Sequence, residues 1–226
     1  MRYGLPAPLC KLFASLALLL SFSASPIAAD SGNEGLTIVA LGDSLTAGYM
    51  LGPDEGFAHQ LEKALKTSGH ENVTVVNAGV SGDTSSGGLA RLDWAVGPEA
   101  DAVIVELGAN DALRAIDPEL TRKNLAEIVS RLKDRGLPVL LAGMLAPPNL
   151  GRDYGESFNT IYPDLAESEG LILYPFFLDG VAGERSLNLA DGIHPTAEGI
   201  AVIVERILPK VEMLIAEARE RQTAGN

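Results

Sequence analysis

Residues 36–45 have the sequence LTIVALGDSL, an apolar run interrupted only by Thr37 and followed by Gly42, Asp43 and Ser44. A short apolar run that stops at a glycine is typical of a strand buried on both faces of a sheet. Ser44 then stands just beyond the carboxyl end of that strand. In parallel sheets covered by helices, ligands bind at this end of the strands. The segment therefore indicates both a fold and the edge at which to look for chemistry.

The same alternation continues along the chain. Further apolar runs occupy residues 73–76, 102–107, 138–144 and 171–174, and stretches of helical character occupy residues 55–66, 88–96, 118–135, 154–169 and 195–219. Five strands separated by helices predict an α/β fold, with one parallel sheet covered on both faces. Pro163 should bend or interrupt the helix around it, and Pro209 leaves the last helix as one long element or two.

Polar clusters lie where the strand-end rule indicates. Ser44 follows the first strand, Gly79 the second and Asn110 the third, whereas Asp191 and His194 stand just before the last helix. Taken singly, each has a plain structural explanation. Glycines and Asn-Asp pairs end strands in turns, and an Asp-x-x-His string fits a helix cap. Their joint occurrence in one chain favours a catalytic site.

These residue types suit nucleophilic catalysis. A serine hydroxyl is a weak nucleophile at neutral pH unless a base takes its proton. His194 can act as that base for Ser44, and Asp191 could fold back to fix the imidazole tautomer. The charge that develops on an attacked carbonyl needs donors already in place. The backbone amides of Ser44 and Gly79 and the side-chain amide of Asn110 could supply them as an oxyanion hole.

This set of residues resembles the motifs of the SGNH (GDSL) hydrolase family. The Ser, Gly, Asn and His markers of that family match Ser44, Gly79, Asn110 and His194. Residues 47–49, 77–79 and 194–199 look closest to the branch of periplasmic acyl-CoA thioesterase I, lysophospholipase and arylesterase. The resemblance implies a flavodoxin-like three-layer α/β/α sandwich over residues 30–226. It also implies an esterase or thioesterase that works through a covalent acyl-serine intermediate, without a metal or cofactor.

The N-terminal segment predicts a signal peptide. Arg2 and Lys11 precede an apolar run at residues 12–22, and small residues follow it. A basic start, a short apolar run and a small-residue exit are typical of a secretory signal. The run is shorter than the roughly 20 residues that span a bilayer, although an uncleaved anchor is the alternative. We place the signal at residues 1–29 and expect an exported protein, periplasmic or secreted, without stable membrane insertion.

Composition and charge exclude several functions. The chain has 226 residues, a formal net charge of −13 and one cysteine, Cys10, which lies within the predicted signal. The remaining residues have no thiol for a disulfide, a cysteine nucleophile or a thiolate metal site. An acidic surface opposes binding to nucleic acid. We expect a monomer whose partner is a small acyl ester or thioester.

Loops at the same sheet edge should form the acyl pocket. Their apolar residues include Met50, Leu51, Leu145 and Phe176, which suit a fatty-acyl or aryl group better than a sugar, although they could equally pack the loops down. Two alternatives remain: a carbohydrate esterase that removes acetyl groups from sugars, and a non-catalytic periplasmic binding module. An α/β-hydrolase is disfavoured because Ser44 does not stand in a Gly-x-Ser-x-Gly motif.

Overall fold

The computed structural model describes residues 1–4 and 35–225. The predicted signal peptide, residues 1–29, therefore lies outside the described residues apart from its first few positions. The chain divides into units at residues 1–30 and 31–226, and the fold below is that of the second unit. No helix within residues 1–4 and 35–225 is long and apolar enough to cross a bilayer.

A five-stranded sheet forms the centre of the second unit, and its strands are β1 (Leu36–Gly42), β2 (Val73–Gly79), β3 (Ala102–Glu106), β4 (Val139–Ala142) and β5 (Ile172–Tyr174). The order across the sheet is β2-β1-β3-β4-β5, and every neighbouring pair is parallel. All five predicted strands are therefore confirmed. Gly42 at the end of β1 pairs with Gly79 of β2 and Glu106 of β3, so three strand ends meet at one edge.

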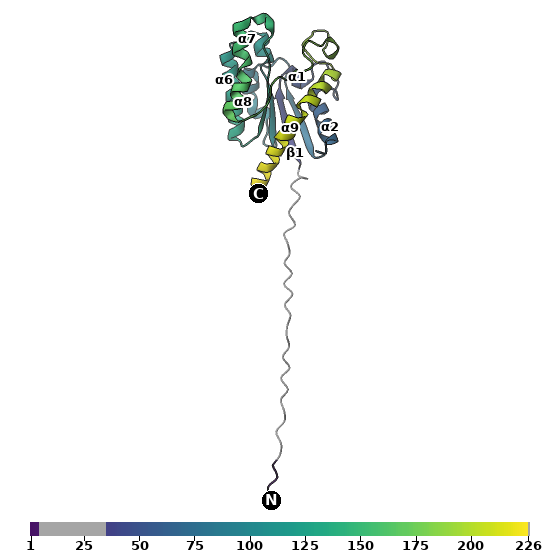
Figure 1. The fold of residues 1–226 in the computed structure, drawn as a ribbon, viewed down its shortest axis with the longest axis vertical. Coiled ribbons are helices and arrows are strands. Elements are labelled where there is room, and N and C mark those ends of the chain that lie inside the picture. The colour runs from purple at the N-terminus through teal and green to yellow at the C-terminus, as the bar shows by residue number, and fades with distance from the viewer. Residues whose placement is uncertain (5–34, 226) are drawn as a thin grey trace. The chain divides into compact units, whose positions relative to one another are not determined.

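Helices cover both faces of this sheet, as predicted. The longer ones are α2 (Phe57–Thr67), α6 (Pro118–Asp134), α7 (Arg152–Asn159), α8 (Ile161–Glu169) and α9 (Ala197–Gly225). Helices α2 and α9 pack together on one face, and α6 and α8 lie on the other (Figure 1). Strands β3 and β4 between these layers are buried along their whole length. This burial explains why both read as apolar runs in the sequence.

Shorter helices lie between these elements. They are α1 (Ser44–Ala47), α3 (Ser85–Ala90), α4 (Leu92–Ala95) and α5 (Ala109–Leu113), together with 3-10 turns at Pro148–Leu150 and Arg185–Leu187. The single helix expected at residues 88–96 is thus two helices, which meet at Arg91. The sequence pattern missed this break because it lies between two short apolar segments.

The two prolines act as the sequence indicated, with one refinement. The interruption ascribed to Pro163 falls at Thr160, between α7 and α8. Pro163 itself lies in the first turn of α8, where a missing N–H has no intrahelical partner to lose. Pro209, by contrast, lies inside α9, which is continuous. The apolar face of α9, including Ile203, Ile207 and Val211, is buried on both sides of that proline and holds the helix against the sheet.

Candidate active site

Three of the predicted catalytic side chains form a hydrogen-bonded series. Ser44 Oγ lies 2.9 Å from His194 Nε2, and His194 Nδ1 lies 2.7 Å from Asp191 Oδ2. Ser44 is the first residue of α1, directly beyond β1, and the other two residues lie on the loop that leads into α9. The structure therefore brings together residues that are far apart in the sequence.

The loop that carries Asp191 and His194 is closed by its own hydrogen bonds. Leu189 N–H donates to the carbonyl of His194 at 2.7 Å, and Gly192 N–H donates to that of Leu189 at 2.9 Å. Asp191 Oδ1 accepts from the amides of Ile193 and His194 at 2.9 and 3.1 Å. The Ile193 amide, followed by the side chain and amide of His194, lowers the pKa of Asp191 to about 2. Asp191 is thus a carboxylate over the whole physiological range.

This geometry fixes the imidazole tautomer. A carboxylate only accepts hydrogen bonds, so Asp191 requires the proton on Nδ1 of His194. Nε2 is then an acceptor, and it faces the hydroxyl of Ser44 at 2.9 Å. A serine in this position can donate its proton to the ring when the oxygen attacks a carbonyl.

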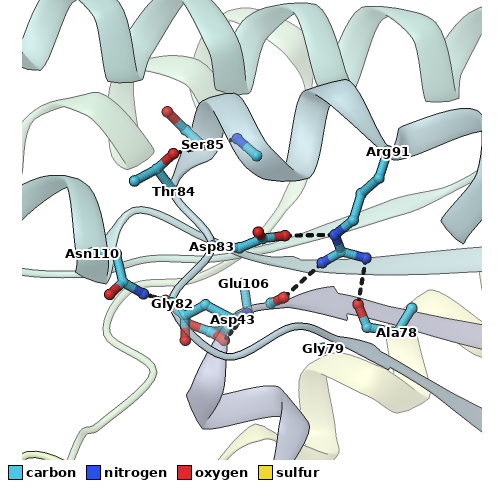
Figure 2. Close-up of polar contacts among 12 residues, drawn as sticks. Asp43, Ala78, Gly79, Gly82, Asp83, Thr84, Ser85, Arg91, Glu106 and Asn110 are labelled. Atoms are coloured by element: carbon cyan, nitrogen blue, oxygen red, sulfur yellow. Dashed lines mark hydrogen bonds and ion pairs between the residues drawn. The ribbon is translucent and has the colours of Figure 1, made fainter.

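Asp43 orients the start of α1 and, with it, Ser44. Its side chain is fully buried and caps the helix: Oδ1 accepts from Leu45 N–H at 3.0 Å. The other oxygen, Oδ2, accepts from the side-chain amide of Asn110 at 3.0 Å (Figure 2). Burial raises the pKa of Asp43 to about 6, although the hydrogen bonds from Leu45 and Asn110 oppose the shift. One carboxylate therefore holds both the nucleophile turn and a predicted oxyanion donor.

A second buried carboxyl lies beneath the same turn. Glu106, at the end of β3, accepts from the hydroxyl of Thr46 at 2.8 Å and, more weakly, from Asp43 N–H at 3.4 Å. Its Oε1 is buried and has no hydrogen-bond partner within residues 35–225. Burial and, secondarily, the charge of Asp43 raise the pKa of Glu106 well above its usual range. We therefore assign the proton of this pair to Glu106.

The expectation that Gly79 supplies an oxyanion donor needs correction. Gly79 N–H donates to Asn77 Oδ1 at 2.9 Å, whereas the next amide, that of Val80, donates to Gly42 of β1. Because amides alternate along a strand, Gly79 N–H points away from β1 and already has a partner. The glycine has a different role here. A Cβ on Gly79 would lie 2.3 Å from Ala47 N, so its absence lets α1 pack on the end of β2.

Gly82, three residues further on, has the free backbone amide that Gly79 lacks. It lies in the loop between β2 and α3 with a φ of +87°, and its N–H has no hydrogen-bond partner within residues 35–225. Its carbonyl accepts from Arg114 Nη2 at 2.8 Å, and Arg114 N–H donates to the carbonyl of Asn110 at 3.1 Å. The loop is thus tied to the segment that carries Asn110. The sequence offered one signal for Gly82, its place in a Gly-Asp-Thr turn after a strand.

Tyr49 is a further neighbour of the series that the sequence did not single out. Its ring centroid lies 4.5 Å from that of His194, with the planes tilted by 37°. Tyr49 follows Gly48, which ends α1 in the left-handed conformation and turns the chain back. The tyrosine ring therefore borders the imidazole and restricts its rotation.

The series opens into an apolar cleft of about 520 Å³. Ser44, Asn110 and His194 lie on its wall, and the rest of the lining is mostly apolar: Leu45, Ala109, Ala112, Leu113, Met144, Leu145, Ala146, Pro147, Pro148, Phe176, Leu178, Ala182 and Ile193, with Gly183, Asn188 and Gly192. Its volume is that of an ordinary small-molecule site.

Two of the expected pocket residues line this cleft and two do not. Leu145 and Phe176 are part of its wall. Met50 is 77% exposed outside it, and Leu51 borders a separate, polar cleft with His59 and Asn77. The turn that starts at Gly48 carries both residues past the mouth, so only Tyr49 of that loop reaches the catalytic series.

A serine, a histidine and a carboxylate in series at the carboxyl edge of a parallel sheet form the arrangement of a serine hydrolase. The comparisons with known proteins agree. The chain belongs to the GDSL-like lipase/acylhydrolase family, whose profile matches residues 40–202. It is thus an enzyme of the SGNH hydrolase type, as the resemblance in its motifs indicated.

Curated relatives and solved structures extend over nearly the same length. The chain is 38% identical to esterase TesA of Pseudomonas aeruginosa over 200 residues, which cover 88% of this chain and 99% of TesA. It is 40% identical to an arylesterase of Vibrio mimicus over 191 residues, or 84% and 93% of the two chains. The crystal structure of AlinE4, an SGNH-hydrolase family esterase, superposes with a TM-score of 0.67 at 44% identity, covering 80% of this chain and 96% of AlinE4.

Proposed function

We propose that this protein hydrolyses carboxylic acyl esters and thioesters in two steps through an acyl-Ser44 intermediate. The observation that carries the proposal is the series from Asp191 through His194 to Ser44, which ends at the wall of an apolar cleft. The names of the relatives, an esterase and an arylesterase, support the same reaction class.

In the first step, Ser44 Oγ attacks the carbonyl carbon and its proton passes to His194 Nε2. The carbonyl oxygen becomes negative and accepts hydrogen bonds from the amides of Ser44 and Gly82 and from Asn110 Nδ2. The first-turn amide of Ser44 has no intrahelical partner, and Asn110 Nδ2 uses one of its hydrogens on Asp43 and keeps the other. When the tetrahedral intermediate collapses, the bond to the alcohol or thiol breaks and the imidazolium of His194 protonates it.

In the second step, water replaces the alcohol or thiol. His194 takes a proton from the water, whose oxygen attacks the acyl carbon of the ester on Ser44. The acid leaves, and the proton returns to Ser44 Oγ. Asp191 remains a carboxylate throughout and stabilises the imidazolium in both steps.

The cleft favours an acyl chain of short to medium length. Phe176 is the one aromatic side chain among its lining residues other than His194, and the apolar residues come from two short helices, α1 and α5, and from loops. Sugar-binding sites rely on stacking aromatics and polar contacts, which this wall offers sparingly. We therefore place an acyl ester or thioester ahead of an acetylated sugar as the substrate.

Acid quench and mass spectrometry test the proposal directly. During turnover of a p-nitrophenyl ester, the protein mass should increase by that of the acyl group, and digestion should locate the acyl group on Ser44. Release of acetate from acetylated sugars, with no turnover of simple acyl esters, would instead favour the carbohydrate esterase. Binding of esters without turnover or adduct would favour the binding module.

We also propose export with removal of residues 1–29, on the basis of Arg2, Lys11 and the apolar run at residues 12–22. N-terminal sequencing of the protein recovered from the secretory compartment should begin at residue 30. We also propose a monomer as the active form, because the series from Asp191 through His194 to Ser44 is complete within a single chain. Sedimentation of the active protein at the mass of one chain would support this assignment, and a stable dimer would contradict it.

A further inference from the structure

Arg91 occupies the break between α3 and α4 and uses all three of its side-chain nitrogens. Nε donates to Asp83 Oδ2 at 2.5 Å, Nη1 to the carbonyl of Ala78 at 2.8 Å and Nη2 to the carbonyl of Gly42 at 2.8 Å. Figure 2 shows the guanidinium between these partners, which belong to different segments of the chain. One side chain therefore joins the end of β1, the end of β2 and the loop that follows β2.

The contacts are largely shielded from solvent. The side chain of Arg91 is 14% exposed and that of Asp83 is 17% exposed. Gly87 of α3 makes room for the carboxylate, because a Cβ there would lie 2.7 Å from Asp83 Oδ1. Shielded carbonyls at strand ends need donors, and a guanidinium supplies several in a rigid plane. A lysine has a single nitrogen and cannot reach the same acceptors in these directions.

The segments that Arg91 joins carry two of the three proposed oxyanion donors. Gly42 stands two residues before Ser44, and Asp83 is the residue next to Gly82. The carbonyl of Gly42 also accepts a hydrogen bond from Val80 N–H at 3.0 Å. The start of the loop after β2 is therefore bonded to the same carbonyl at the end of β1 that Arg91 contacts. A displacement of either segment would change the separation between the amides of Ser44 and Gly82.

We propose that Arg91, paired with Asp83, is a positioning residue that sets the spacing of the oxyanion hole by fixing the Gly82 loop to the end of β1. Arg91 is not part of the cleft wall and touches no reacting atom, so it acts only through the backbone. The inference rests on the proposed roles of Ser44 and Gly82. A guanidinium that merely stabilised the fold would have no selective effect on the transition state.

The test compares Arg91→Ala and Arg91→Lys with the natural protein, well below their unfolding temperatures. We expect kcat on p-nitrophenyl butyrate to fall about 100-fold in Arg91→Ala, as when one oxyanion donor is lost, with KM changed less than about threefold. Affinity for an alkyl boronic acid, which forms a tetrahedral adduct with the serine, should fall in parallel. Arg91→Lys should not restore the rate, whereas added methylguanidinium should partly rescue Arg91→Ala.

Arg122→Ala is the matched control, because Arg122 on α6 donates its hydrogen bonds to Thr160 and Asp164 at the surface rather than to the strand ends or the Gly82 loop. Its kcat should equal that of the natural protein. If Arg91→Ala does not fold, Asp83→Asn answers the same question: a tenfold lower kcat at constant KM supports the inference. A kcat within about twofold of the natural value in either variant, with only the unfolding temperature lowered, overturns it.

Failure of the proposed function has a different signature. If Ser44→Ala retains full turnover, the catalytic assignment itself is wrong, whatever the Arg91 variants do. If Ser44→Ala is inactive and the Arg91 variants keep their kcat and boronate affinity, the assignment stands and the inference about Arg91 fails.

Discussion

The carboxylate of Asp43 accepts a hydrogen bond from the side-chain amide of Asn110 at 3.0 Å, with the aspartate fully buried. The same carboxylate caps the helix that begins with Ser44. The proposed nucleophile, Ser44, and a proposed oxyanion donor, Asn110, follow different strands and are therefore held by one side chain. Their relative position depends on Asp43 carrying its charge and keeping both contacts.

This arrangement predicts that the effects of Asp43 and Asn110 substitutions on kcat are not additive. Asn110→Ala should lower kcat about 100-fold with little change in KM, because a donor to the transition state is lost. Asp43→Ala should lower kcat by a similar factor through the misoriented amide, and should also lose a helix cap worth about 1 kcal/mol. The double variant should lose little more than either single variant. Rate losses that multiply in the double variant would show that Asp43 does not act through Asn110.

Asp191 should set the tautomer of His194 and stabilise its imidazolium, and should have little effect on substrate binding. Asp191→Asn presents an amide to Nδ1 of His194 and favours the tautomer with the proton on Nε2, which cannot accept from Ser44. We expect kcat to fall by about 10³ to 10⁴, with KM nearly unchanged, in steady-state kinetics. Because its pKa is lowered to about 2, Asp191 contributes stability that is complete above its usual pKa near 4 and is lost progressively as the pH falls from about 4 through about 2. A kcat within about tenfold of the natural value in Asp191→Asn would contradict this assignment.

The buried carboxyl pair of Asp43 and Glu106 predicts that the free energy of unfolding depends on pH. Because the folded-state pKa of Glu106 is raised, the folded protein keeps a proton that the unfolded chain releases. The resulting stability is complete below the ordinary glutamate pKa and is lost as the pH rises toward the folded-state value, by about 1.4 kcal/mol per pH unit for one proton. Glu106→Gln should flatten this decline between pH 5 and 8 in urea unfolding and keep most of the activity.

A matched control for that experiment is Glu127→Gln, which replaces an exposed glutamate on α6. It should reproduce the natural pH dependence of the free energy of unfolding. Asp43, with a pKa raised to about 6, makes a smaller decline of the same sign that should persist in Glu106→Gln. An unchanged slope in Glu106→Gln would mean that Glu106 is not the group that holds the proton.

The cleft predicts which residues set acyl chain length. Phe176→Ala should enlarge the pocket and move the optimum of a p-nitrophenyl ester series toward longer chains, with the change in kcat/KM concentrated on those substrates. Met50→Ala should leave the profile unchanged, because Met50 lies outside the cleft. The opposite result, a shift with Met50→Ala and none with Phe176→Ala, would place the acyl group on the other side of Tyr49.

The sequence was sufficient to predict the sheet and to select the three residues that form the hydrogen-bonded series. Strands such as Ala102–Glu106 are buried on both faces, so their composition alone reveals them. Ser44, Asp191 and His194 could be predicted because hydrolysis requires those residue types and parallel strands place their ends together. The short distances between these side chains come from strand pairing and from the closure of the loop before α9, which a local sequence pattern cannot predict.

Residues whose role depends on the direction of a backbone group could not be predicted in the same way. Gly79 ends β2 and Gly82 follows it, and only the path of the chain shows which of the two amides is free. Arg91 falls inside the single helix predicted at residues 88–96, and its partners are 8 to 49 residues away in the sequence. Met50 and Leu51 have the apolar character of pocket residues, but the turn at Gly48 directs them elsewhere.

Hydrolysis of p-nitrophenyl esters of graded acyl length by the natural protein and by Ser44→Ala tests the central claim most directly. Ser44 should be essential, so the variant should lose at least about 10³-fold in kcat while it unfolds at the same temperature as the natural protein. Equal rates in the two proteins would remove Ser44 from the mechanism and contradict the account.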